Sequence, residues 1–408
     1  MRLPIVTVIL AFILTLLVDW YILADVRKAS RRPHRRRNTW IFIATCLPYW
    51  ALLIVGVSLP IREADRSILP VMWILFTYIS ILVPKLVYVL CSLIGRLINI
   101  RSRRLENYGA MAGVPLAVLV CVVMWWGVAV TRHEIEVKEV QVVSDRIPEH
   151  FDNYRMVQIS DIHTGTWGDD TTFVSKLVEC VNGLNPDVVM FTGDIVNRQT
   201  SELQPFLTVL SKLKARDGVY SVLGNHDYGD YTDWPNPGLR ETNNALLAAW
   251  QKQMGWRLLN NEYEYLRRDN DSVVLIGVEN WGEPPFGQYG DLSKAYPKGE
   301  SGRGPYDGNF KILMTHNPMH WAQVVCKESN IDLTLSGHTH AMQMELDVFG
   351  KRLSPAVFRY PYWGGMYEDK SKEGTPMRLY VNIGDGEVAL PMRIGATPEV
   401  TVLTLKRK

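Results

Sequence analysis

Long hydrophobic segments occupy the first third of the chain, whereas the rest alternates short apolar runs with polar residues. A helix needs about 20 apolar residues to cross a bilayer, and soluble core helices rarely reach that length without polar interruption. The first third contains four such runs, at Pro4–Ala24, Thr39–Leu59, Ile68–Leu90 and Tyr108–Val130. The first run carries Asp19 and lacks a strong basic segment before it, which argues against a cleaved signal peptide. We therefore expect a transmembrane domain of four helices over residues 1–131.

Arginines in the short loops predict the orientation of these helices. The first loop is rich in basic residues from Arg27 to Arg37, and the second, Ile61–Ser67, balances its arginines with acidic residues. The third loop contains Arg96, Arg101, Arg103 and Arg104. Because basic loops stay in the cytoplasm, we expect the first and third loops inside. The N-terminus and everything after about Thr131 are then expected outside.

Two charged residues, Asp19 and Lys85, lie within or near the apolar runs. Such charges can mark a transport path, but here each is expected to snorkel or to lie at a helix end. The chain has five cysteines and no Cys-x-x-Cys spacing, which disfavours a thiolate metal site. A disulfide between Cys180 and Cys326 is left open by the sequence.

The pattern after Thr131 is typical of an α/β domain over residues 132–408, with strands and helices in alternation. Helices are expected at Phe173–Leu184, Leu203–Leu213 and Asn243–Gln253. Strands are expected at Ile135–Val143, Tyr154–Ser160, Pro186–Thr192, Gly218–Leu223, Phe310–Thr315 and Ile331–Ser336. Further strands at Met344–Phe349, Met377–Ile383 and Pro398–Leu405 suggest a second layer of strands.

Polar segments rich in oxygen and imidazole ligands follow five of these strands. They are Asp161-Ile-His163, Gly193-Asp194, Gly224-Asn225-His226-Asp227, His316 within Thr-His-Asn-Pro, and Gly337-His338-Thr339-His340. Each segment alone is typical of an ordinary polar turn. Together they lie where open sheets place their sites, beyond the strand ends, and they supply enough ligands for two metal ions. Carboxylate, amide and imidazole ligands without thiolate suit Mn²⁺, Fe or Zn²⁺.

This ordered set resembles the calcineurin-like metallophosphoesterases from roughly Tyr154 to the C-terminus, and the preceding spans resemble their membrane-anchored bacterial branch. The resemblance implies a four-layer αββα sandwich. It implies that one metal is held by Asp161, His163, Asp194 and His340. It implies that the other is held by Asp194, Asn225, His316 and His338, so that Asp194 bridges the two.

The resemblance also implies a role for His226, which is not expected to be a ligand. It would stabilise developing charge or protonate the leaving oxygen, and Asp227 would orient its ring. The expected cofactors are two divalent ions, Mn²⁺ first, with Fe, Zn²⁺ and Mg²⁺ as alternatives. Two such ions would activate a bridging hydroxide for attack on phosphorus.

The function expected from these observations is a phosphohydrolase of the bacterial cytoplasmic membrane whose catalytic domain lies on the extracytoplasmic face. Its partners would be membrane lipids and a phosphorylated, lipid-linked or envelope substrate, cleaved at a phosphoester or pyrophosphate bond. The aromatic segments Tyr228–Asn309 and Pro355–Tyr367 are expected to wall the pocket. No nucleic-acid partner is expected, since the formal net charge is only +2.

Three alternatives remain at this point. A UDP-diacylglucosamine-type pyrophosphatase of lipid A synthesis is disfavoured by the predicted outside orientation. A non-catalytic membrane scaffold or sensor is disfavoured because every expected ligand is present. A transporter with a regulatory soluble domain is disfavoured because four spans with few polar residues make a weak pathway.

Overall fold

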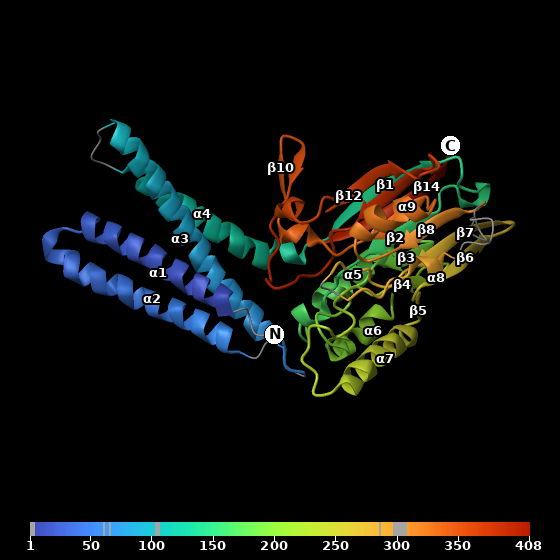
Figure 1. Ribbon diagram of the computed structural model, residues 1–408, viewed down its shortest axis with the longest axis horizontal. Coiled ribbons are helices and arrows are strands. Elements are labelled where there is room, and N and C mark those ends of the chain that lie inside the picture. The colour runs from blue at the N-terminus through green and yellow to red at the C-terminus, as the bar shows by residue number, and fades with distance from the viewer. Residues whose placement is uncertain (1–4, 60–61, 65–66, 103–106, 285–286, 297–307) are drawn as a thin grey trace. The chain divides into compact units, whose positions relative to one another are not determined.

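The computed structural model describes residues 5–59, 62–64, 67–102, 107–284, 287–296 and 308–408 (Figure 1). The chain forms two compact units. One comprises Met1–Ala129 with Ala389–Met392, and the other comprises Val130–Val388 with Arg393–Lys408. We call them the membrane unit and the soluble unit, and each is described by itself.

Four long helices make up the membrane unit, as predicted: α1 (Ile5–Ala29), α2 (Arg35–Ser58), α3 (Leu69–Ser102) and α4 (Tyr108–Ala129). All four are long and apolar enough to cross a membrane. The third helix continues beyond its predicted end at Leu90, through the polar residues Ser92 and Arg96. Both side chains contact Asp25 on α1, so this polar stretch of α3 makes interhelical contacts within the bundle. Arg103 and Arg104 lie outside the described residues.

The two intramembrane charges contact each other, contrary to the expectation of separate snorkelling or helix-end positions. The Lys85 ammonium on α3 lies 2.7 Å from Asp19 Oδ1 on α1. Trp50 on α2 donates from Nε1 to Asp19 Oδ2 at 2.8 Å. The same ammonium lies 4.2 Å from the centroid of the Tyr49 ring. This group joins three helices, as interhelical polar contacts do in membrane bundles.

The variant Asp19→Ala tests this pairing, because it leaves the Lys85 ammonium without its carboxylate. We expect the detergent-solubilised protein to lose at least about 1–3 kcal/mol of stability, the cost of an unsatisfied buried polar group, and to melt at a lower temperature. The double variant Asp19→Ala/Lys85→Met removes both charges and should regain part of that loss. Equal melting temperatures for the single variant and the unmodified chain would contradict the pairing.

Two six-stranded sheets form the centre of the soluble unit. The first sheet has the order β1-β14-β2-β3-β4-β5 and the second has the order β12-β13-β9-β8-β7-β6. The first contains β1 (Glu136–Ser144), β14 (Glu399–Arg407), β2 (Arg155–Ile159), β3 (Val188–Phe191), β4 (Val219–Ser221) and β5 (Trp256–Leu258). The second contains β12 (Gly365–Lys370), β13 (Pro376–Val381), β9 (Leu333–Ser336), β8 (Phe310–Met314), β7 (Asp271–Gly277) and β6 (Glu262–Arg268). Strands β2 to β5 are mutually parallel, as are β7, β8, β9 and β13.

Three apolar layers hold these sheets and their helices together. Side chains such as Met190 and Ile312 fill the space between the two sheets. Helices α5 (Thr172–Gly183), α6 (Leu207–Leu210) and α7 (Pro237–Gln253) cover the outer face of the first sheet. Helix α8 (Leu292–Ala295) and the helical segment Trp321–Glu328, which ends in α9 (Cys326–Glu328), cover the outer face of the second. The predicted αββα sandwich is therefore confirmed.

Several predicted elements differ from the structure. The segment Tyr228–Asn309 supplies β5, β6 and β7 besides the predicted helix. The sequence of β6, Glu-Tyr-Glu-Tyr-Leu-Arg-Arg, has no continuous apolar run, as suits a partly exposed edge strand. The helix predicted at Leu203–Leu213 begins as a 3₁₀ segment, Thr200–Phe206, which contains Pro205 and so loses a backbone donor. Cys180 and Cys326 are both free.

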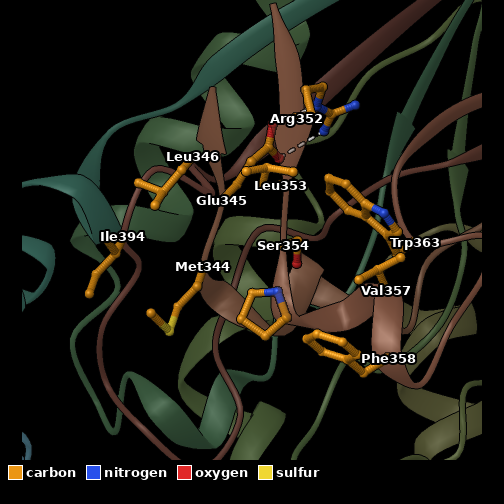
Figure 2. A pocket seen from close by; sticks show the side chains of 11 residues that line it. Met344, Glu345, Leu346, Arg352, Leu353, Ser354, Val357, Phe358, Trp363 and Ile394 are labelled. Carbon is orange, nitrogen blue, oxygen red and sulfur yellow. Dashed lines mark hydrogen bonds and ion pairs between the residues drawn. The ribbon is translucent and has the colours of Figure 1, made fainter. Parts of the chain in front are cut away.

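The strand predicted at Met344–Phe349 belongs to neither large sheet. Instead β10 (Leu346–Val348) and β11 (Lys351–Leu353) form a separate antiparallel hairpin. Its residues Leu346 and Leu353 line an apolar pocket (Figure 2). The chain reverses at Phe349-Gly350, both with positive φ, so the strand ends at Val348 and pairs with β11.

Candidate metal centre

Strand ends from both sheets deliver the candidate ligands to one place. In the first sheet, Asp161 follows β2, Asp194 follows β3 and Asn225 follows β4. In the second sheet, His316 follows β8 and His338 follows β9. Because neighbouring parallel strands end at the same edge of a sheet, their loops converge there.

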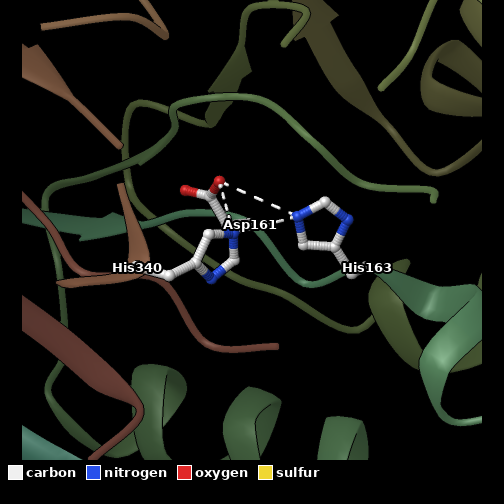
Figure 3. A group of neighbouring side chains, drawn as sticks. All are labelled: Asp161, His163 and His340. Carbon is white, nitrogen blue, oxygen red and sulfur yellow. Dashed lines mark hydrogen bonds and ion pairs between the residues drawn. The ribbon is translucent and has the colours of Figure 1, made fainter. Parts of the chain in front are cut away.

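The first group of ligands contains Asp161, His163 and His340, all buried (Figure 3). The Nε2 atom of His340 lies 3.3 Å from Asp161 Oδ1, and the Nε2 atom of His163 lies 3.9 Å from the same oxygen. The two Nε2 atoms are 3.1 Å apart. Three potential ligand atoms thus face one small volume.

The second group contains Asp194, His316 and His338. The Nε2 atom of His316 lies 3.0 Å from Asp194 Oδ2, 3.2 Å from His338 Nδ1 and 3.2 Å from Asn225 Oδ1. The Oδ2 atom of Asp194 also lies 3.7 Å from His163 Nε2. Asp194 therefore lies between the two groups.

The backbone at several of these ligands is left-handed. Positive φ values occur at Asp161 (55°), His163 (49°), Asp194 (61°), His338 (76°) and His340 (50°). Such conformations cost non-glycine residues of the order of 1–3 kcal/mol each and cluster at functional sites. The surrounding fold must therefore hold these loops in place.

Hydrogen bonds behind the ligands fix which ring nitrogens face the centre. His163 Nδ1 lies 3.2 Å from the Val196 carbonyl, and His316 Nδ1 lies 2.8 Å from the Thr192 carbonyl. Each Nδ1–H donates to its carbonyl, so Nε2 is the nitrogen of each ring that faces the centre and could bind a metal. Imidazole nitrogens and carboxylate oxygens that converge on one small volume form a donor set that fits a divalent cation.

The electrostatics of the centre give several candidate ligands, though not His316, the protonation states that metal binding needs. Burial raises the pKa of Asp161, but His340 and His316 outweigh burial and hold it below its ordinary value. Burial likewise raises the pKa of Asp194, but His316 and His226 hold it well below. Burial lowers the pKa of His338 to about 3 and that of His163 well below its ordinary value. These carboxylates are thus ionised and these two imidazoles neutral, as metal binding requires. Burial lowers the pKa of His316, but Asp194 and Asp161 outweigh burial and raise it to about 9, so this imidazole must lose a proton when it binds a metal.

His226 borders the two groups without joining either. Its ring centroid lies 4.9 Å from that of His163, and its ring stacks on Tyr231 at 4.4 Å. Its Nδ1 lies 2.6 Å from the Asn197 carbonyl, and its backbone N–H donates to Asp194 Oδ1 at 2.8 Å. The ring is therefore oriented by a main-chain carbonyl and an aromatic neighbour.

Asp227 was expected to orient the ring of His226, but its hydrogen bonds lie elsewhere. Its Oδ2 accepts from the backbone N–H groups of Asp194 and Gly224, both at 2.8 Å. Its Oδ1 accepts from Ile195 at 3.0 Å and from Val196 at 3.3 Å. Adjacent side chains diverge here, so Asp227 braces the loop that carries Asp194.

Three further residues contact the ligands and were not assigned from the sequence. Tyr360 OH lies 3.1 Å from His338 Nε2, and Tyr231 OH accepts from Asn225 Nδ2 at 2.9 Å. Both tyrosines belong to the aromatic segments predicted as pocket walls, so the aromatic composition of these segments was the sequence signal for them. Arg393, fully buried, places Nη2 3.3 Å from His340 Nδ1 and belongs to no motif.

Comparison with known proteins gives the same division of the chain. Residues 154–342 match the family model of the calcineurin-like phosphoesterases, and residues 1–132 match that of the probable calcineurin-like phosphoesterase transmembrane domain. The chain is 30% identical over 347 residues to the "Transmembrane protein with metallophosphoesterase domain" of Danio rerio, covering 81% of this chain and 71% of that relative. It is 30% identical over 279 residues to the "Uncharacterized metallophosphoesterase YkuE" of Bacillus subtilis (strain 168), covering 67% of this chain and 86% of that relative.

Proposed function

Because the chain belongs to the calcineurin-like phosphoesterases and is a membrane-anchored, metal-dependent phosphoester hydrolase, we propose that it cleaves a phosphoester or pyrophosphate bond in a lipid-linked substrate. The observation that carries the proposal is the pair of ligand groups joined by Asp194, with His226 at their border. The four membrane helices support a lipid-linked substrate, because they keep the centre close to a bilayer.

We propose that Asp161, His163, His340 and Asp194 hold one divalent ion, and that Asp194, Asn225, His316 and His338 hold the other. The nitrogen and oxygen donors support Mn²⁺, with Fe, Zn²⁺ and Mg²⁺ as alternatives. Bound ions of this kind lower the pKa of an attacking water and neutralise charge on phosphoryl oxygens. Asp227 then acts as a positioning residue, since it holds the backbone of the Asp194 loop.

His226 is proposed to donate a proton to the leaving oxygen. Its Nδ1 is held by the Asn197 carbonyl, so the opposite nitrogen is the one left for substrate. An alkoxide leaving group needs that proton, whereas a nitrophenolate leaves without it. The dependence of the rate on the leaving group therefore reports on this residue.

We expect His226→Ala to slow hydrolysis of an alkyl phosphoester by about 10²–10⁴-fold, the range typical of general acid catalysis, and to slow a nitrophenyl ester much less. The measurement is kcat for both esters with the full chain, after metal removal and reloading with Mn²⁺. His150→Ala, which removes an exposed histidine bound to Asp271, is the matched control and should change neither rate. Equal losses on the two esters would contradict the role of proton donor.

We also propose that the soluble unit lies on the extracytoplasmic face of the bacterial cytoplasmic membrane. The basic residues between Arg27 and Arg37 support this orientation, because such loops stay in the cytoplasm. An alkaline phosphatase reporter, which is active only outside the cytoplasm, should be active when fused after Lys408. It should be inactive when fused after Asn38, which follows the basic run in the first turn of α2. The reverse result would contradict the orientation.

A further inference from the structure

The hairpin β10–β11 and the 3₁₀ segment that follows it, Pro355–Phe358, expose large apolar side chains to solvent. Phe349 at the hairpin turn is 103% exposed and Phe358 is 93% exposed, relative to a free reference residue. Leu346, Val348, Leu353 and Val357 are also exposed. We call these six residues the apolar hairpin surface. Single exposed hydrophobic residues are ordinary, but a contiguous group marks an interaction site.

The register of the hairpin separates its apolar and charged residues. Leu346 is opposite Leu353, Val348 is opposite Lys351, and Asp347 is opposite Arg352. Directly opposite residues share a face, and the next pair along occupies the other face. The leucines and Val348 therefore share one face, with Lys351 near the turn, while the Asp347 and Arg352 pair occupies the other.

A pocket of about 410 Å³ adjoins the apolar face (Figure 2). Its walls include Leu346, Leu353, Val357 and Phe358 of the apolar hairpin surface, together with Met344 and Ile394. Arg352 closes one side, where its Nη2 lies 2.8 Å from Glu345 Oε2 and its guanidinium lies 4.9 Å from the Trp363 ring. The surface is thus apolar at its centre and charged at its rim.

A lipid bilayer is the occupant that this chemistry fits best. A two-stranded hairpin with no core of its own is marginal in water, and this one protrudes from the soluble unit (Figure 1). An exposed aromatic residue at a protruding turn, here Phe349, with a lysine nearby, here Lys351, is typical of segments that enter the headgroup region. The four spans keep a bilayer within reach of the same chain at all times.

We infer that the apolar hairpin surface docks onto the membrane and buries Phe349 and Phe358 at the boundary between headgroups and acyl chains. Tyr360 follows Phe358 by two residues and places its hydroxyl 3.1 Å from His338 Nε2. The docked segment therefore leads directly to the metal centre and presents it to the lipid surface. This docking is separate from the proposed catalytic function, and the inference does not depend on which phosphoester bond is cleaved.

The test uses the full chain in nanodiscs made of equal parts phosphatidylcholine and phosphatidylglycerol. The photoreactive residue p-benzoylphenylalanine replaces Phe349 or Phe358, one position per variant. It replaces Leu239 as a matched control, since Leu239 is 43% exposed and α7 lies on the opposite side of the soluble unit from β10 (Figure 1). After illumination, mass spectrometry should find lipid adducts at positions 349 and 358 and none at position 239.

Other outcomes overturn the inference. Absence of lipid adducts at both positions, in variants that still hydrolyse a soluble nitrophenyl ester, would exclude docking while leaving the proposed function intact. Adducts with a second copy of the chain would make the surface a protein interface instead. Lipid adducts at a probe replacing Val357, without any at Phe349, would assign the pocket to a single bound lipid and exclude docking of the turn.

Discussion

The variant Asp194→Asn should abolish two-metal binding and lower the rate of phosphoester hydrolysis by roughly 10³-fold or more, because bound metal contributes several kcal/mol to the transition state. Asp194 Oδ2 lies 3.0 Å from His316 Nε2 of the second group and 3.7 Å from His163 Nε2 of the first, so it reaches both ligand groups. An amide keeps the shape of the side chain but loses the negative charge that two cations need. The measurements are metal content by elemental analysis and kcat with a nitrophenyl ester.

Asp169→Asn is the matched control, since Asp169 is an exposed carboxylate six residues after His163. It should keep both the metal content and the rate of the unmodified chain. Full metal content and activity in Asp194→Asn would contradict the bridging position, and with it the proposed ligand assignment.

The second large effect is expected at Gly337, where the chain has no room for a side chain. A Cβ atom at this position would overlap Ser160 Oγ and Asp161 Oδ2. Gly337→Ala must therefore displace the Asp161 carboxylate or the backbone that leads to His338. We expect loss of the first metal and a fall in kcat comparable with that of Asp194→Asn, with metal content and kcat as the measurements.

Gly183→Ala controls for the substitution itself, because a Cβ atom there would meet no atom within 4 Å. We expect this variant to change neither the metal content nor kcat. Retention of both metals by Gly337→Ala would contradict the close approach of the Gly337 loop to Asp161.

The candidate ligands could be found from the sequence because each follows a strong local signal. A buried parallel strand is a short apolar run, and a histidine or aspartate directly after it lies at the sheet edge whatever the rest of the chain does. The αββα arrangement itself came from the family resemblance. Residues such as Asp161 and His338 could therefore be identified without knowledge of tertiary contacts.

Other features depend on contacts between distant segments. The edge strand β6 is partly exposed, and only a short alternation of glutamate with tyrosine marks it, without the buried apolar run that identified strands such as β3 and β8. The direction of the Asp227 side chain follows from the turn at Gly224 and from four backbone donors on other residues. The ion pair between Asp19 and Lys85 depends on how three helices meet, which hydropathy does not encode.

The origin of the candidate ligands in two different sheets would tie metal loading to folding. Asp161, Asp194 and Asn225 come from the first sheet, and His316, His338 and His340 come from the second. An ion held by both sets acts as a cross-link between the halves of the sandwich, and its binding energy is added to the stability of the folded state. Loading and folding then form a single equilibrium. The supply of metal in the cell would decide what fraction of this enzyme persists, as well as how fast each molecule works.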